Sequence, residues 1–264
     1  FALSDSEYMF DVLNFSLKAK DYVVQPIMAY QFNFIDNERK KLGQIHLYAM
    51  DAIGYINLCR LVRSSHEPYQ SVQGLLTPSE PMLDLSMLKD FNEGLICLTG
   101  GGNNGLTYNL LPKRQKDTEK LISQLKNIFQ NRLYLEICRN GGVTQKEADI
   151  EDILINIANK LEIPLVATTD IWYATPDRHD AWLLMDAVNR KDVVMVQDVS
   201  TDNVTDFLQQ KDIIVSSDKR LYYMRSAEEM KEMFSHLPEA YENTKFIALR
   251  CHYHALKRVP ILPP

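Results

Sequence analysis

A carboxylate follows an apolar run near the middle of the chain, in the stretch IPLVATTDIWYATPDRHDA at residues 163–181. The run is typical of a buried strand that ends at Asp170, and an aromatic loop and a helix are expected after it. The carboxyl ends of strands in α/β proteins form the crevice in which catalytic groups collect. Asp170 is therefore either a metal ligand in an active site or the remnant of one.

The histidines offer little further chemistry, because none forms an H-x-x-x-H or H-E-x-x-H zinc motif. His252 and His254 alternate after a helical stretch, where such side chains can meet a metal ion but more often meet water. His179 stands beside Asp180 at the start of a helical pattern, and we expect capping and a local hydrogen bond there. The loop GGGNNG at 100–105 lacks the phosphate-loop lysine and the G-x-G-x-x-G spacing, so it is interpreted as a tight turn after a strand.

The composition suits one soluble α/β barrel of 264 residues, with 45% hydrophobic and 24% charged residues. No apolar run approaches the roughly 18 to 20 residues of a membrane span. The net charge is −6 and the basic residues are scattered, which argues against a main DNA clamp. Four cysteines without a C-x-x-C pair, three of them in apolar patterns, favour a reducing cytoplasm.

The hydrophobic pattern alternates between strands and helices every 25 to 35 residues or so, which predicts βα units and a mostly parallel sheet. Strands are expected at 23–32, 44–50, 94–100, 132–139 and 164–170, and two more are candidates between 190 and 217. Helices are expected at 7–20, 52–62, 116–129, 146–161, 226–237 and 239–251. Ser226 and Glu229 have the spacing of a capping box.

Several stretches together resemble one family. They are GYINLCRLV (54–62), LYLEICRNG (133–141), IPLVATTDIWY with the following PDRHDAWLL, and YYMRSAEEMKEMFSHLPEAYENTKFIALRC (222–251). They resemble the polymerase-and-histidinol-phosphatase (PHP) domain of the bacterial DNA polymerase III alpha subunit. The opening LSDSEYMFDVLNFSLKAK resembles the family's strand, Thr-Asp and helix, and the resemblance covers nearly the whole chain apart from about 190–220.

The resemblance implies a distorted, TIM-like barrel of seven βα units, (βα)7. We expect residues 1–258 to be the PHP domain without the family's first strand, which carries an H-x-H motif and would precede Phe1. Residues 259–264 would begin a linker toward the polymerase palm. The chain starts without Met and ends in VPILPP, so it is expected to be a fragment of a longer protein.

The resemblance also allows each metal position of the family to be compared with this chain. Metal-bearing members hold three ions at the strand ends through His, Asp, Glu and Cys. Two carboxylates match these positions, Asp5 and Asp170. The other positions carry Ser6, Gln31, Gln44, Gly101, Asn140 and Trp172. His46 lies two residues after Gln44 on the same strand face, so a shift in register would bring a histidine back.

Six replaced ligands predict that no metal cluster forms and that this fragment has no catalytic residues or cofactor of its own. Trp172 is expected to fill the space of the metal pocket with its ring. The leading hypothesis is a cytoplasmic, non-catalytic scaffold that docks the epsilon proofreading exonuclease subunit. The parent protein would synthesise DNA with Mg²⁺ in its palm, and would bind DNA, nucleotides and other replicase subunits mainly outside this fragment.

Three other hypotheses remain open. One is a residual metal-dependent phosphoesterase or 3′–5′ exonuclease that uses His46 and the family's first strand. Another is the PHP domain of an error-prone polymerase paralogue. The last is an unrelated barrel enzyme that shares only the βα periodicity.

Overall fold

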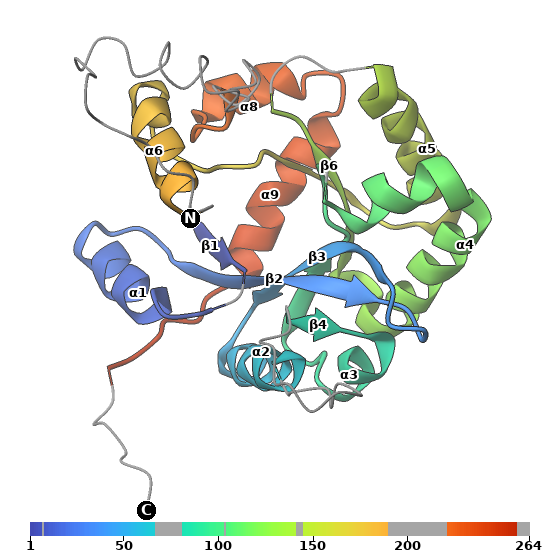
Figure 1. Ribbon diagram of the computed structural model, residues 1–264, viewed down its shortest axis with the longest axis horizontal. Coiled ribbons are helices and arrows are strands. Elements are labelled where there is room, and N and C mark those ends of the chain that lie inside the picture. Colours follow the sequence, from blue (N-terminus) through green and yellow to red (C-terminus); the bar gives the residue numbers. More distant parts are fainter. Residues whose placement is uncertain (7, 67–80, 103, 141–144, 190–220, 258–264) are drawn as a thin grey trace, which may run out of the picture.

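The computed structural model describes residues 1–6, 8–66, 81–102, 104–140, 145–189 and 221–257. Within them the strands curl into a half-barrel with helices around the outside (Figure 1). The elements are β1 (Ala2–Asp5), α1 (Val12–Asp21), β2 (Ile27–Ile35), β3 (Lys41–Ala49), α2 (Ala52–Ser65), β4 (Met82–Leu83), α3 (Leu85–Asp90), β5 (Leu95–Leu98), α4 (Leu106–Phe129), β6 (Leu133–Cys138), α5 (Gln145–Leu161), β7 (Leu165–Thr168), α6 (His179–Asn189), α8 (Ala227–Met233) and α9 (Pro238–Arg250), with short 3-10 turns at Gln130–Arg132 and Pro176–Arg178.

The strand order is β1-β2-β3-β5-β6-β7, and β4 pairs with the far end of β2. The pairs β1–β2, β2–β4, β5–β6 and β6–β7 are parallel, so the predicted α/β class and mostly parallel sheet are confirmed. Strand β3 runs antiparallel to both β2 and β5. The carboxyl ends of β5, β6 and β7 therefore meet on one edge, and this edge positions the candidate site.

The antiparallel strand arises from a hairpin that the sequence analysis did not predict. Asp36 fixes the turn, because its Oδ1 accepts hydrogen bonds from the backbone N–H groups of Glu38 and Lys40, at 2.9 Å each. Arg39 takes a positive φ of 64° there. The turn sends β3 straight back along β2, so β3 starts at Lys41 rather than at the expected residue 44.

Other predicted boundaries need correction. The strand expected at 23–32 begins only at Ile27, after Pro26, and Val23 is exposed with a φ of +56°. The helix expected at 7–20 begins at Val12, and the helix expected at 116–129 is the second part of the longer α4. Elements β4 and α3 were not predicted. The candidate strands between 190 and 217 lie outside the described residues.

The core lies between the curled sheet and the helices around it. Strand β2 contributes three large aromatic members, Tyr30, Phe32 and Phe34, each exposed by 1% or less. Helix α8 begins with the predicted capping box: Ser226 Oγ accepts from the Glu229 N–H, and the Glu229 carboxylate accepts from the Ser226 N–H. None of the helices in the described ranges combines the length and apolarity that crossing a bilayer requires.

Candidate functional site

The strand-end site is built from residues of β3 and β6 and from the segment that follows β7. Glu136 and Cys138 project from the end of β6, Asp170 follows β7, and His46 comes from β3. Parallel pairing places Cys138 beside Thr168, and antiparallel pairing places His46 beside Leu98. Residues far apart in the sequence thus meet at one edge of the sheet, as the sequence analysis expected for Asp170.

Glu136 is a buried carboxylate at the centre of this group, with only 3% of its surface exposed. Its Oε1 accepts a 2.6 Å hydrogen bond from the hydroxyl of Thr168. Its Oε2 lies 3.5 Å from Nδ1 of His46 and has no hydrogen-bond partner among the described residues. A buried charge needs such compensation, since its transfer from water is costly. The imidazole of His46 is the nearby group that forms an ion pair with this carboxylate when it is protonated.

Asp170 and Asn140 hold each other through two hydrogen bonds. The backbone N–H of Asp170 donates to Asn140 Oδ1 at 2.8 Å, and Asn140 Nδ2 donates to Asp170 Oδ2 at 3.3 Å. Burial raises the pKa of the Asp170 carboxyl, and the charge of Glu136 raises it further. The hydrogen bond from Asn140 and the charge of His46 oppose this rise. Asn140 thus acts as a clamp on Asp170.

The loop at 100–105 is the tight turn that the sequence predicted. Gly100 and Gly102 have positive φ values of 73° and 69°, and the carbonyl of Gly100 accepts a 3.1 Å hydrogen bond from Thr107 Oγ1. A Cβ on Gly101 would lie 2.4 Å from Cβ of Cys138. The space of a side chain at position 101 is thus already filled by β6.

The remaining predicted positions lie at the end of β1, on β2 and on β3. Asp5 ends β1, and burial together with the charge of Asp11 raises its pKa. Ser6 is exposed. Gln31 pairs with His46 across the β2–β3 ladder, and Gln44 Nε2 donates to Asn33 Oδ1 at 3.2 Å.

Trp172, which the sequence predicts to fill the metal pocket, lies in an aromatic stack; the filling of a metal pocket stays a prediction. Its ring is 42% exposed and stacks on Trp182 and Tyr222, with centroids 4.7 Å and 4.0 Å apart. The backbone N–H of Trp172 also donates to the carbonyl of Tyr222 at 2.9 Å.

The other histidines follow their predicted roles. His179 is buried, and its Nδ1 lies 2.9 Å from Oδ1 of Asp180, which confirms the local hydrogen bond. Its ring meets Tyr173 edge-on. His252 and His254 are both exposed after α9.

Sequence reasoning missed Glu136, Cys138 and Thr168 as members of the site. The available signal was Glu136 itself, a carboxylate inside the otherwise apolar strand LYLEIC. A charged residue that is fully buried is rare unless it is paired, so a glutamate inside this apolar strand indicates a partner side chain nearby. Cys138 gave no comparable signal, because cysteine is an ordinary buried residue.

The donor atoms of this site do not fit the metal cluster of the family. Across the described ranges, no three His, Cys, Asp or Glu side chains are placed to share one metal ion. Asn140 is engaged with Asp170 at both ends of its amide, and Thr168 takes one oxygen of Glu136. The side chains at the strand ends therefore bond to one another.

Comparison with known proteins agrees with this architecture. The sequence matches the PHP domain over residues 1–140, and the chain belongs to this family. Its relatives include DNA polymerase III subunit alpha of Caulobacter vibrioides, 29% identical, and of Rickettsia bellii, 32% identical; each match spans 99% of this chain. The alpha subunit of Borreliella burgdorferi is 30% identical over the same share. The chain spans only about a fifth of the length of these relatives, between 20% and 22%.

Replacing Asp170 tests the electrostatics of the site. The folded-state pKa of Asp170 is raised, so its contribution to stability is fully present below the unfolded pKa and is lost as pH rises through the folded pKa. Asp170→Asn removes the carboxyl group whose ionisation lowers the stability, and the oxygen of the new amide can still accept a hydrogen bond from Asn140. The variant should therefore gain stability over the parent chain as the pH rises from about 4 to about 7, measured by urea unfolding. Asp152→Asn, at an exposed position of α5, is the control. If the stability gained by Asp170→Asn over the parent chain shrinks toward neutral pH, the electrostatic explanation is wrong.

Packing between the glycine turn and β6 can be tested by a double mutant. Gly101→Ala should cost about 1–3 kcal/mol of unfolding free energy, because the new methyl meets Cys138. Cys138→Gly removes the side chain that the new methyl meets. The double mutant should therefore recover much of the unfolding free energy that Gly101→Ala loses. The coupling energy from denaturant unfolding of the four proteins measures this. Simple additivity would show that the two positions do not compete for one space.

Proposed function

We propose that this chain is the PHP domain of a replicative DNA polymerase III alpha subunit and that it works as a non-catalytic scaffold in the cytoplasm. The parent protein carries out template-directed DNA synthesis, with Mg²⁺ held in a palm domain outside these residues. The names of the relatives support the parent's activity. Other replicase subunits, DNA and nucleotides are bound mainly by the rest of that protein.

The observation that carries the scaffold proposal is the bonding of the strand-end side chains to one another. Asp170 is clamped by Asn140, and Glu136 is bonded to Thr168 and faces His46. Hydrolysis of a phosphodiester by this family would need closely spaced divalent ions that activate water and neutralise the phosphate. The hydrogen bonds among these side chains favour a role in stabilising the fold over a role in catalysis.

We further propose that the epsilon proofreading exonuclease docks on this domain through its carboxyl-terminal segment. Support comes from an apolar stripe on α6, formed by Leu184, Met185 and Val188, which are 38%, 69% and 68% exposed. Residues three and four apart share one helix face. Trp172 extends this stripe through its stack on Trp182, and we call Trp172, Leu184, Met185 and Val188 the α6 patch. Exposed apolar patches of this kind mark interaction surfaces.

A second candidate function is a residual metal-dependent phosphoesterase or 3′–5′ exonuclease. One observation favours it: His46 faces an oxygen of Glu136 that lacks a hydrogen bond within the described residues. An imidazole and a carboxylate are suitable ligands for a divalent metal. Two such groups alone would hold an ion weakly.

The docking proposal predicts binding of the epsilon subunit to the full chain with a dissociation constant of tens of micromolar or lower, in calorimetric titration. Removal of the carboxyl-terminal tail of epsilon should abolish it. Met185→Glu should weaken binding about tenfold or more, because a charge would enter an apolar contact. Leu249→Glu, at a 75% exposed position of α9, should leave affinity unchanged. Absence of binding, or equal loss in both variants, would contradict docking at the α6 patch.

Metal analysis separates the scaffold from the residual enzyme. The purified chain, incubated with Mn²⁺ or Zn²⁺ and dialysed, should retain less than one ion per molecule by elemental analysis. His46→Gln should leave that value unchanged. Two or more retained ions, lost in His46→Gln, would establish the metal-dependent alternative.

A further inference from the structure

Two adjoining hollows lie along α4, one toward the β2–β3 hairpin and one toward α3, and both have Leu85 and Gln124 in their walls. The first encloses about 280 Å³ and the second about 480 Å³. We call the pair the α3–α4 groove. It is separate from the strand-end site and shares no residue with the α6 patch.

A break in α4 borders the first hollow. Pro112 lies inside the helix and Arg114 has non-helical angles, φ −149° and ψ 58°. A proline within a helix removes one backbone hydrogen bond and its ring displaces the preceding turn. Thr118 then bonds to the carbonyl of Arg114 at 2.8 Å, which steadies the second part of the helix. Both residues that border this break, Arg114 and Thr118, line the hollow.

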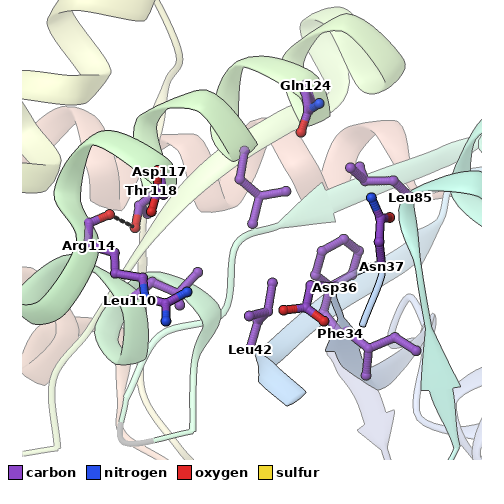
Figure 2. Close-up of a pocket in the computed structure, with 12 residues that line it drawn as sticks. Phe34, Asp36, Asn37, Leu42, Leu85, Leu110, Arg114, Asp117, Thr118 and Gln124 are labelled. Atoms are coloured by element: carbon purple, nitrogen blue, oxygen red, sulfur yellow. Dashed lines mark hydrogen bonds between the residues drawn. The ribbon is translucent and has the colours of Figure 1, made fainter. Parts of the chain in front are cut away.

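The walls of the first hollow are apolar. Phe34 is buried in the core, and Leu42, Leu85, Leu110 and Leu121 are partly buried against it. Figure 2 shows the leucine and phenylalanine side chains gathered between the hairpin and α4. Apolar walls of this kind with a polar rim suit a branched or aromatic side chain.

The rim of the first hollow is net negative. Asp36 comes from the hairpin, and Asp117 and Arg114 come from α4 (Figure 2). Asp36 is held in place by the two backbone N–H groups of its turn. Asp117 and Arg114 are exposed and make no side-chain ion pair with the described part of the chain. Two carboxylates against one guanidinium favour a positively charged group beside the apolar occupant.

The second hollow has four polar residues in its walls beside the apolar Leu85 and Ile128. Gln124 and Asn127 lie three residues apart on one helix face, and Lys89 and Asn92 line the other side. Side-chain amides offer both donors and acceptors, which match those of an extended peptide backbone.

We propose that the α3–α4 groove binds an extended peptide segment of a partner protein. One side chain of the size of leucine or phenylalanine enters the first hollow, and a lysine or arginine next to it meets Asp36 and Asp117. The backbone of the segment runs along the amides of Gln124 and Asn127. This site goes beyond the docking of an exonuclease at the α6 patch and does not depend on it.

The test uses NMR titration of the full chain with three capped dipeptides. Acetyl-Lys-Leu-amide should bind about two- to five-fold more tightly than acetyl-Glu-Leu-amide, the effect of one exposed ion pair. It should bind at least about tenfold more tightly than acetyl-Lys-Ala-amide, because the alanine leaves the first hollow empty. Asp117→Lys should reverse the preference between the lysine and glutamate probes.

A matched control separates local from general charge effects. Asp152→Lys, on the exposed face of α5, should leave all three affinities unchanged, and Leu121→Trp should abolish binding by filling the first hollow. Circular dichroism checks that each variant is folded. Equal affinity for the three probes overturns the proposal, as does a preference that Asp117→Lys does not move. Binding of free L-leucine without binding of acetyl-Lys-Leu-amide would assign the hollow to an amino acid and also overturns it.

Discussion

The carboxylate of Glu136 on β6 is buried, and the other side chains of the strand-end site are arranged around it. A carboxylate that is 3% exposed must be compensated, and the fold supplies the hydroxyl of Thr168 and the imidazole of His46. Burial and the charge of Glu136 raise the pKa of the Asp170 carboxyl, and the hydrogen bond from the Asn140 amide lowers it. These groups are therefore coupled, and the loss of any one leaves another without its partner.

The end of β6 is also tied to the outer helices. Arg139 bonds to both carboxylate oxygens of Glu151 on α5, at 2.7 Å each through Nη2, and its Nη1 donates to the carbonyl of Met233 on α8. His236 lies 3.0 Å from the same carboxylate. A bidentate pair of low exposure gives a defined geometry. This network fixes the segment from which Glu136, Cys138 and Asn140 project.

Hydrogen bonding and packing engage the side chains at the strand ends. Amides and a hydroxyl satisfy the carboxylates, and β6 occupies the side-chain space beside Gly101. The proposed scaffold role depends on surfaces outside this site. Those surfaces are the exposed stripe of α6 and the groove between α3 and α4, which lie on different elements and differ in chemistry.

The sequence by itself determined the α/β class, most of the helices, the capping box of Ser226 and the tight glycine turn, because each depends on residues close together in the chain. It also determined which side chains stand at the family's ligand positions. Tertiary structure decided the antiparallel β3, the partners of Glu136 and the outward stack of Trp172 on Tyr222. The direction of β3 follows from a turn of a few residues at Asp36, which the apolar pattern alone does not reveal. The partners of Glu136 and Trp172 lie tens of positions away, and no local pattern specifies which of several distant partners a side chain will meet.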